Sequence, residues 1–128
     1  MKTVIYTDHA PKPIGPYSQA VRVGPFLFCS GQIPIDPTSG QIVQGDVRAQ
    51  AKQVMENIQA VLKQADLNFS DIVKTTIFLT DMKEFSMVNE VYGSFFKNNY
   101  PARSTVQVAA LPLGVKVEIE ILAYVQDV

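Results

Sequence analysis

The spacing of hydrophobic residues divides the chain into short strands and two helices. Residues 20–23 and 26–29 are apolar β runs separated by Gly24-Pro25, a turn signal, and together they predict a hairpin. A short strand is expected before them, at residues 3–6. Residues 72–79, with the sequence IVKTTIFL, are rich in β-branched side chains and almost continuously apolar. This pattern predicts a central strand covered on both sides.

Two further segments carry the periodicity of amphipathic helices. The first begins after Asp46, a preferred N-cap residue, and the second begins near Asp81, which has capping-box spacing with Glu84. The first apolar stripe consists of Val47, Ala51, Val54, Met55, Ile58, Val61, Leu62 and Ala65, and the second of Phe85, Val88, Val91, Tyr92, Phe95 and Phe96. The second helix is expected to stop before Pro101. Residues 34–45, which are rich in proline and glycine, are expected to form a loop.

The last two predicted strands each have one apolar face and one polar or charged face. In the first, Arg103, Thr105 and Gln107 share one face, and Ser104, Val106 and Val108 share the other. In the second, Val117, Ile119, Ile121 and Ala123 point to the core, and Lys116, Glu118 and Glu120 point away from it. Two strand–helix–strand crossovers in so short a chain predict an α+β fold with a mixed sheet and both helices on one face.

The other face of that sheet is left uncovered by the predicted elements. In the hairpin, Val21, Val23, Phe26 and Phe28 share one parity and Leu27 and Cys29 the other, so both faces carry apolar groups. Monomers rarely expose an apolar patch of that size, which favours burial against further copies of the chain. Arg103 and Glu118 are then expected at or near an interface.

Composition limits the classes of function. The 128 residues, 47% of them hydrophobic, are expected to form a single domain spanning 1–128. A net charge of −1 without runs of like charge argues against nucleic acid as the main partner. The N-terminus lacks the apolar run of a signal peptide, and no stretch reaches the roughly 20 apolar residues of a membrane span. We therefore expect a cytoplasmic protein without a membrane partner.

The inventory of reactive side chains is small. Because the chain has one cysteine, Cys29, and one histidine, His9, it cannot form an internal disulfide or a Cys/His metal cluster, and we expect no metal or cofactor. The glycine in Ser30-Gly31-Gln32 indicates either an ordinary bulge or a site where a ligand approaches the backbone. Arg103 and Glu118 are consistent with a structural ion pair or with a ligand site.

Five segments resemble a known family. They are IGPYSQ at residues 14–19, SGQIP at 30–34, VNEVY at 88–92, PARS at 101–104 and VEI at 117–119. In order and spacing they resemble the reactive-intermediate deaminases, the RidA or YjgF family. The resemblance implies a chorismate-mutase-like α+β fold with a six-stranded mixed sheet, assembled as a homotrimer with three clefts between neighbouring subunits. It also implies hydrolysis of 2-imino acids and their enamines, such as 2-iminopropanoate and 2-iminobutanoate, to 2-oxo acids and ammonia.

The resemblance also assigns roles to residues. Arg103 would hold the substrate carboxylate, Glu118 would position or activate water, and the cleft would be lined by Tyr17, Ser30, Gly31 and Asn89. The spacing alone favours a solvated helix position for Asn89 over a place at the edge of a site. Many relatives have cysteine where this chain has Thr105, which puts thiol-based regulation there in doubt but not hydrolysis. Glu120 is expected to be a structural partner of Lys116 or Arg103.

The chemistry is consistent with these residue types. A guanidinium binds a carboxylate through two parallel hydrogen bonds, and lysine does this less well. An iminium carbon is already electrophilic, so a positioned water and a proton acceptor suffice for hydrolysis. Two alternatives stay open: a non-catalytic trimer that binds small carboxylates in a regulatory or chaperone-like role, and an RNA-directed activity, which the acidic balance disfavours.

Overall fold

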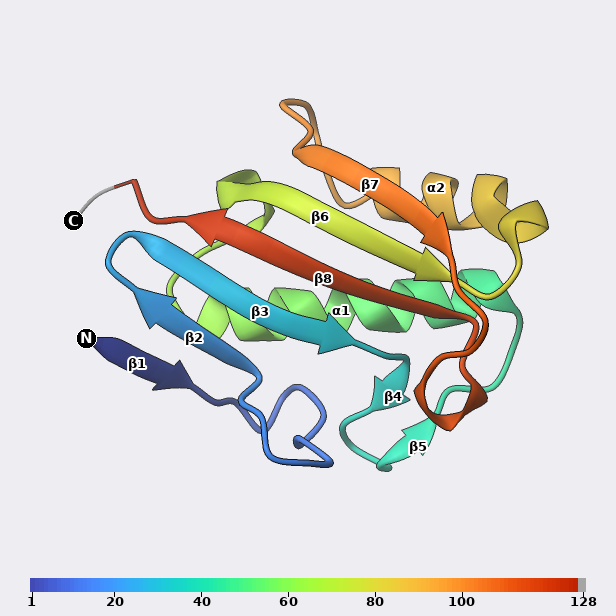
Figure 1. The fold of residues 1–128 in the computed structure, drawn as a ribbon, viewed down its shortest axis with the longest axis horizontal. Helices are drawn as coiled ribbons and strands as arrows, with labels where there is room; N and C mark the ends of the chain where they lie inside the picture. Colours follow the sequence, from blue (N-terminus) through green and yellow to red (C-terminus); the bar gives the residue numbers. More distant parts are fainter. Residues whose placement is uncertain (127–128) are drawn as a thin grey trace.

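A computed structural model describes residues 1–126, which form an α+β fold built on a six-stranded mixed sheet (Figure 1). The strand order is β1-β2-β3-β8-β6-β7, and both helices lie on one face of the sheet. The strands are β1 (Lys2–Ile5), β2 (Ala20–Val23), β3 (Phe26–Gln32), β6 (Ile72–Leu79), β7 (Ala102–Gln107) and β8 (Val117–Tyr124), and the helices are α1 (Val47–Gln64) and α2 (Phe85–Gly93). The predicted fold class is confirmed.

The last strand occupies the middle of the sheet. β8 lies between β3 and β6 and is antiparallel to both, while β6 and β7 are parallel neighbours. β3 and β6 therefore run in the same direction, and α1 connects them across the strand that is added last. α2 makes the second crossover, from β6 to β7. β7 is consequently an edge strand, as expected for an accessible Arg103.

The first helix follows the predicted pattern and adds two buried polar residues. Asp46 caps α1 by accepting hydrogen bonds from the backbone N–H groups of Arg48 and Ala49. On the buried side of the helix, Asn57 donates to the carbonyls of Ile33 and Ile35, and Gln50 accepts from the backbone N–H of Lys116. α1 thus holds the chain that leaves β3 and the chain that enters β8.

The second helix is shorter than predicted. Asp81 caps a separate 3-10 turn, Met82–Glu84, and α2 ends at Gly93, so the predicted stripe residues Phe95 and Phe96 lie beyond the helix. Their rings still pack in the core, because Phe96 contacts Tyr92 at 5.0 Å between ring centroids. The helical spacing correctly indicated burial there but not the end of the helix.

The predicted loop at residues 34–45 contains two short strands. β4 (Ile35–Asp36) and β5 (Gln41–Ile42) pair in a separate two-stranded sheet, joined through Gly40 at a φ of 73°. The local proline and glycine pattern correctly indicated a turn there, but two residues per strand are too few to give a periodic signal.

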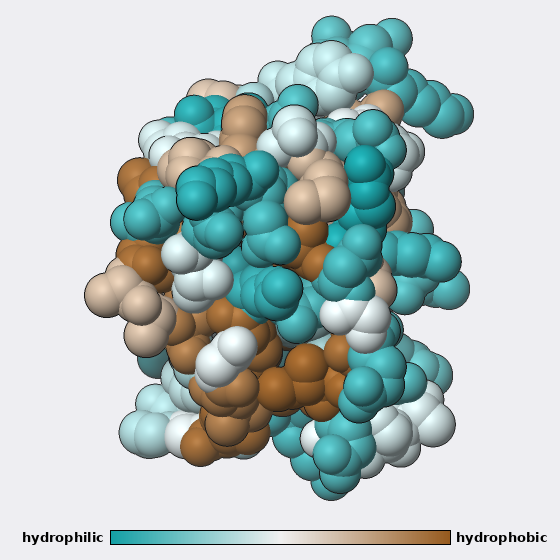
Figure 2. Space-filling model, turned by 90° about the vertical axis from the view of Figure 1, so that its right-hand side faces the viewer, coloured by the Kyte–Doolittle hydropathy of each residue, from teal (hydrophilic) through white to brown (hydrophobic). Residues whose placement is uncertain are grey.

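The sheet face opposite the helices, called here the open face, is partly apolar. Val23, Phe28 and Tyr124 are 42%, 47% and 40% exposed, and the Phe26 ring lies against both aromatic neighbours. In Figure 2, hydrophobic residues gather in the left and lower parts of the view, the open face lying on the left. The prediction that β6 is covered on both sides is therefore wrong within one chain, because only its helix-facing residues are buried.

No helix within residues 1–126 combines the length and apolar character needed to cross a membrane.

Candidate functional site

Arg103 is held against α2 on the helix-covered face of the sheet. Its Nη1 donates to Oδ1 of Asn89 at 2.7 Å, and its guanidinium lies 5.3 Å from the ring centre of Phe85 and 5.2 Å from that of Tyr92. The three α2 residues are spaced i, i+4 and i+7, so they share one side of the helix. They fix the guanidinium while only one of its five N–H groups is used by Asn89.

The support for Arg103 extends into the core. Tyr92 shares a 2.8 Å hydrogen bond with Thr75, the residue opposite Arg103 on β6. Burial raises the pKa of Tyr92, against smaller opposing effects of that hydrogen bond and of the Arg103 charge. A cavity of about 430 Å³ opens beside the guanidinium, lined by Asn89, Tyr92, Gly93, Tyr100, Pro101 and Arg103.

Glu118 lies on the other face of the sheet. It pairs with Phe78 on β6, which in turn pairs with Val106 on β7, and these residues alternate with the helix-facing ones. Between Cys29 and Gln32, β3 bulges, so that Ser30 and Gly31 oppose the single residue Glu120. A Cβ added to Gly31 would lie 2.0 Å from Oε2 of Glu118. Glycine therefore lets the carboxylate rest against the bulge.

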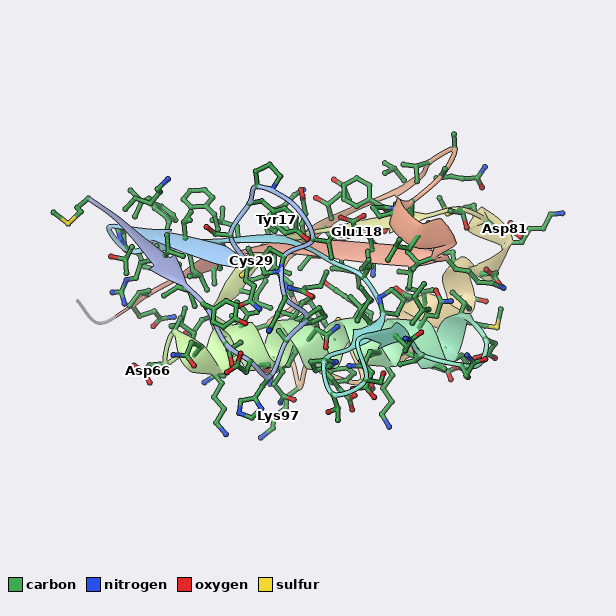
Figure 3. The ribbon with its side chains drawn as sticks, turned by 90° about the horizontal axis from the view of Figure 1, so that it is seen from below. Tyr17, Cys29, Asp66, Asp81, Lys97 and Glu118 are labelled. Carbon is green, nitrogen blue, oxygen red and sulfur yellow. The ribbon has the colours of Figure 1, made fainter. Side chains whose placement is uncertain are left out.

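The loop before β2 completes this second group. Figure 3 shows Tyr17 and Glu118 on the side of the sheet opposite α1. The Ser30 hydroxyl donates to the carbonyl of Ser18 at 2.6 Å, and the buried Gln19 side chain makes four hydrogen bonds to the backbone of residues 7–11. A cavity of about 440 Å³ is lined by Ile14, Tyr17, Ser30, Gly31, Ile33, Pro112, Glu118 and Glu120.

Glu120 lies beside Glu118 in this cavity and does not form the expected pair with Lys116 or Arg103. Burial raises the pKa of Glu118, and the neighbouring Glu120 carboxylate raises it further. The expected partners of Glu120 are engaged elsewhere, because Lys116 Nζ lies 3.6 Å from Oε2 of Glu84 and Arg103 binds Asn89. The predicted structural pairing of Glu120 is therefore wrong within the chain.

The predicted site residues thus form two separate groups. Tyr17, Ser30, Gly31 and Glu118 surround one cavity, whereas Arg103 and Asn89 line another across the sheet. The ion pairs within residues 1–126 are Arg48–Glu90 and Lys116–Glu84, so Arg103 and Glu118 do not pair inside one chain. Residue spacing did not reveal the aromatic support of Arg103, although the i, i+4, i+7 pattern on α2 contains it.

Two small side chains near these groups have different surroundings. Thr105 lies two residues after Arg103 on β7, and its hydroxyl is buried without a hydrogen-bond partner among the described residues. Cys29 is buried on the core side of β3, and burial raises the pKa of its thiol to about 12. Cys29 is therefore a poor nucleophile at neutral pH.

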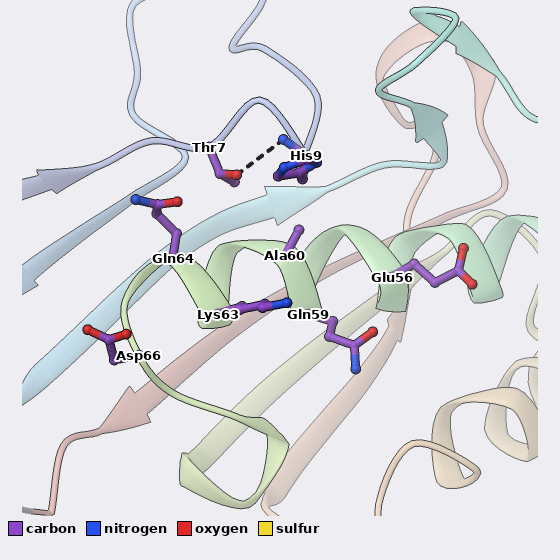
Figure 4. A pocket seen from close by; sticks show the side chains of 8 residues that line it. All are labelled: Thr7, His9, Glu56, Gln59, Ala60, Lys63, Gln64 and Asp66. Atoms are coloured by element: carbon purple, nitrogen blue, oxygen red, sulfur yellow. Dashed lines mark hydrogen bonds between the residues drawn. The ribbon is translucent and has the colours of Figure 1, made fainter.

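A further cavity lies away from both groups. It has a volume of about 720 Å³ and opens between the N-terminal loop and α1, where His9, Glu56, Lys63 and Asp66 mix positive and negative charge (Figure 4). Within residues 1–126, no three His, Cys, Asp or Glu side chains gather closely enough to hold a metal ion. Neither feature bears on Arg103 or Glu118.

Comparison with known proteins identifies the family. A family model described as endoribonuclease L-PSP matches residues 7–125. The chain belongs to this family. The chain is 53% identical to a RutC family protein from Pyrococcus horikoshii over 124 residues, which are 97% of this chain and 98% of that protein. The human 2-iminobutanoate/2-iminopropanoate deaminase is 50% identical over 123 residues, 96% of this chain and 90% of that protein.

Solved structures of the L-PSP family agree with the fold. The chain superposes on the crystal structure of TdcF from E. coli with bound serine with a TM-score of 0.92 and 47% sequence identity. The match covers 95% of this chain and 98% of the TdcF chain. The resemblance to RidA inferred from the sequence motifs is thereby confirmed at the level of the family. Relatives of the chain are named deaminase, RutC family protein and endoribonuclease.

Proposed function

We propose that the chain hydrolyses 2-imino acids, such as 2-iminopropanoate and 2-iminobutanoate, to 2-oxo acids and ammonia in clefts shared between the subunits of a homotrimer. The observation that carries the proposal is the division of the site residues: a carboxylate-binding cation and an acidic water-activating group occupy opposite faces of one sheet. Neither cavity alone contains both. A second copy that presents its Glu118 cavity to the edge strand β7 supplies the missing half.

The surface of the chain supports such an assembly. The open face carries Val23, Phe28 and Tyr124 as exposed apolar groups, and burying them between copies is favourable by roughly 25 cal/mol per Å² of apolar surface. Arg103 lies on an edge strand, where a neighbouring copy can approach it. An assembly in which one copy covers the open face of its neighbour and also reaches the edge of β7 would bring the two halves together.

Arg103 has the role of orienting the substrate. Its guanidinium is held by Asn89, Phe85 and Tyr92, and its remaining N–H groups are suited to a bidentate bond with a carboxylate. A small 2-imino acid offers few other groups to hold. Fixing its carboxylate therefore fixes where C2 lies relative to the attacking water.

Glu118 has the role of proton acceptor. Water attacks C2 of the iminium, its proton passes to Glu118, and the electrons of the C=N π bond move to nitrogen. The carboxyl then returns the proton to nitrogen. As the C–N bond breaks with its electron pair going to nitrogen, Glu118 takes the hydroxyl proton and the carbonyl forms. Transfer of that proton to the departing ammonia yields the oxo acid and ammonium. A carboxyl whose pKa is raised by burial and by Glu120 is better matched to both steps.

The names of relatives agree with this chemistry. Human, mouse and rat relatives at about 50% identity are called 2-iminobutanoate/2-iminopropanoate deaminases. The TdcF structure contains serine, a small molecule that carries a carboxylate. These names support a small carboxylate ligand for this chain.

Mixing two inactive variants tests the shared cleft. Alone, Arg103→Lys should lower kcat/KM about ten- to a thousandfold, and Glu118→Gln should lower kcat about a hundredfold or more. In a mixed assembly, a cleft is intact when its arginine comes from a Glu118→Gln chain and its glutamate from an Arg103→Lys chain. Random mixing in equal amounts makes about one quarter of the clefts intact, one half times one half. Oxo acid formation from imino acid generated in situ is the readout.

The result separates the alternatives. Recovery to about a quarter of the wild-type rate supports the shared cleft, since two independent in-chain sites would recover nothing. Mixed assemblies verified by native mass spectrometry that stay inactive would overturn it. A wild-type protein that binds 2-oxobutanoate but accelerates no hydrolysis would be a carboxylate binder. Salt-sensitive RNA cleavage without imine hydrolysis would favour the RNA-directed activity.

A further inference from the structure

We propose that Glu120 determines specificity by forming, with Glu118, a paired acidic end of the cavity that selects the cationic iminium nitrogen over the uncharged carbonyl oxygen of the product. The inference rests on the proposed function and assigns the charge state of the substrate. Arg103 from another copy takes the carboxylate end, and the two glutamates take the nitrogen end.

The geometry places both carboxylates at one cavity. Glu118 and Glu120 are two residues apart on β8, so they point to the same face, and both line the 440 Å³ cavity beside the bulge at Gly31. The other ionisable side chain lining this cavity is the phenol of Tyr17. The lining therefore contains two acids and no base.

The surrounding strands do not neutralise the pair. On β6, Glu118 faces Phe78 and Glu120 faces Thr76, and on β3 the bulge presents Ser30 and Gly31. None of these four residues carries a charge.

Two lysines of the sheet have other partners, and Lys12 lines the neighbouring cavity that shares Ile14, Tyr17, Gly31 and Ile33 with this one. Lys116 shares the face of Glu118 but lies against Glu84, and the ammonium of Lys74 donates to the hydroxyl of Ser104 at 3.1 Å. Within residues 1–126, neither Glu118 nor Glu120 takes part in an ion pair. The half-buried Glu118 and the exposed Glu120 thus give this end of the cavity a negative charge, which a cation bound there relieves.

The substrate and product differ in that charge. A 2-iminium acid is a zwitterion, whereas the 2-oxo acid keeps the negative carboxylate and loses the positive nitrogen. The paired acids therefore attract the substrate end where hydrolysis occurs and repel the anionic product once the nitrogen has left. Glu120 thus favours substrate binding and product release without touching the attacking water.

Neutralising Glu120 tests the inference. In Glu120→Gln, the inhibition constant of 2-oxobutanoate should fall and the KM of the imino acid should rise, each about three- to tenfold. The acidic limb of the kcat profile should move to lower pH, because the Glu120 charge helps to raise the pKa of Glu118. Glu120→Asp, which keeps the charge, should restore wild-type values. Glu56→Gln, the same change on the exposed side of α1, serves as the control.

The outcomes distinguish this inference from the proposed function. If Glu118→Gln is inactive but Glu120→Gln keeps the wild-type inhibition constant, KM and pH profile, the specificity role of Glu120 is wrong and the proposed hydrolysis stands. If Glu118→Gln is as active as the wild type, the proposed function itself fails. If Glu120→Asp behaves like Glu120→Gln, the carboxylate acts through its size and position and the charge argument is overturned.

Discussion

The two halves of the candidate site are built in opposite ways. Arg103 is an exposed residue on an edge strand, and side chains from α2 hold its guanidinium by a hydrogen bond and two aromatic rings. Glu118 is half-buried on a central strand, and the backbone bulge makes room for its carboxylate because residue 31 has no Cβ. The cation is thus positioned by side chains and the anion by backbone.

This difference matters for how each half tolerates change. Several side-chain contacts hold the Arg103 guanidinium, and removing one of them leaves the others in place. Single substitutions around Arg103 should therefore lower activity by graded amounts. At the bulge, by contrast, a single added Cβ on residue 31 would occupy the position of the Glu118 carboxylate and displace it. Substitutions at the bulge should therefore remove activity while leaving the fold in place.

Among the residues that support Arg103 and Glu118, Gly31 should show the strongest effect on activity when it is substituted. An added Cβ would collide with the end of the Glu118 side chain, which can rotate away at little cost to the fold, and no left-handed φ strains the backbone there. Gly31→Ala should therefore lower kcat about a hundredfold, as loss of a positioned base does, while the thermal midpoint changes little. Steady-state kinetics and a thermal melt on the same sample measure both.

Gly15→Ala is the matched control for this prediction. Its Cβ would lie 3.7 Å from the Tyr17 ring, an ordinary contact, in the loop beside the same cavity. It should retain most of the activity. If Gly31→Ala is as active as Gly15→Ala, the bulge does not position the Glu118 carboxylate for the reaction.

An intermediate effect is expected at Tyr92. Tyr92→Leu removes one ring from under Arg103 and should raise KM about fivefold to thirtyfold with less change in kcat, because a cation–π contact is worth roughly 1–2 kcal/mol. Tyr92→Phe keeps that ring and loses only the hydrogen bond to Thr75. It should cost about 1 kcal/mol of unfolding free energy and leave KM within about threefold of the wild type.

The two Tyr92 variants distinguish a positioning role of the ring from a packing role. If the Tyr92 ring only fills the core, both variants should have the same KM. Each should then lose activity only in proportion to its loss of stability. Similar KM values for Tyr92→Leu and Tyr92→Phe would therefore contradict a positioning role. Titration with 2-oxobutanoate gives the same answer without turnover.

Much of this architecture was predictable from the sequence, and the missing part has a definite physical origin. The helical periodicity of residues 47–65 located α1, and the β-branched, almost continuously apolar run at residues 72–79 located β6. Five short motifs located the candidate residues. Parity within a strand, however, does not say which faces of two strands coincide. That depends on the insertion of β8 between β3 and β6, and this pairing placed Arg103 and Glu118 on opposite faces.

The error at Glu120 has a similar cause. Its expected partners were charges nearby in sequence, whereas Lys116 finds Glu84 just ahead of α2 and Arg103 finds an uncharged amide. The bulge at Gly31 was correctly suspected from one glycine in an apolar run. The contact between Gly31 and Glu118 joins residues far apart in the sequence, so no local sequence pattern could predict it.

The smallest expected effect is at Cys29, which belongs to neither half. Its thiol is buried on the core side of β3 and its pKa is raised to about 12 by burial, so only about one molecule in ten thousand carries a thiolate at pH 8. Iodoacetamide should therefore label the folded protein at least about a hundredfold more slowly than the chain unfolded in guanidinium, and turnover should survive the treatment. Mass spectrometry counts the label and a kinetic assay follows activity in the same tube. Rapid labelling of the folded protein with matching loss of turnover would place a reactive group outside both halves, and hydrolysis could no longer be assigned to Arg103 and Glu118 alone.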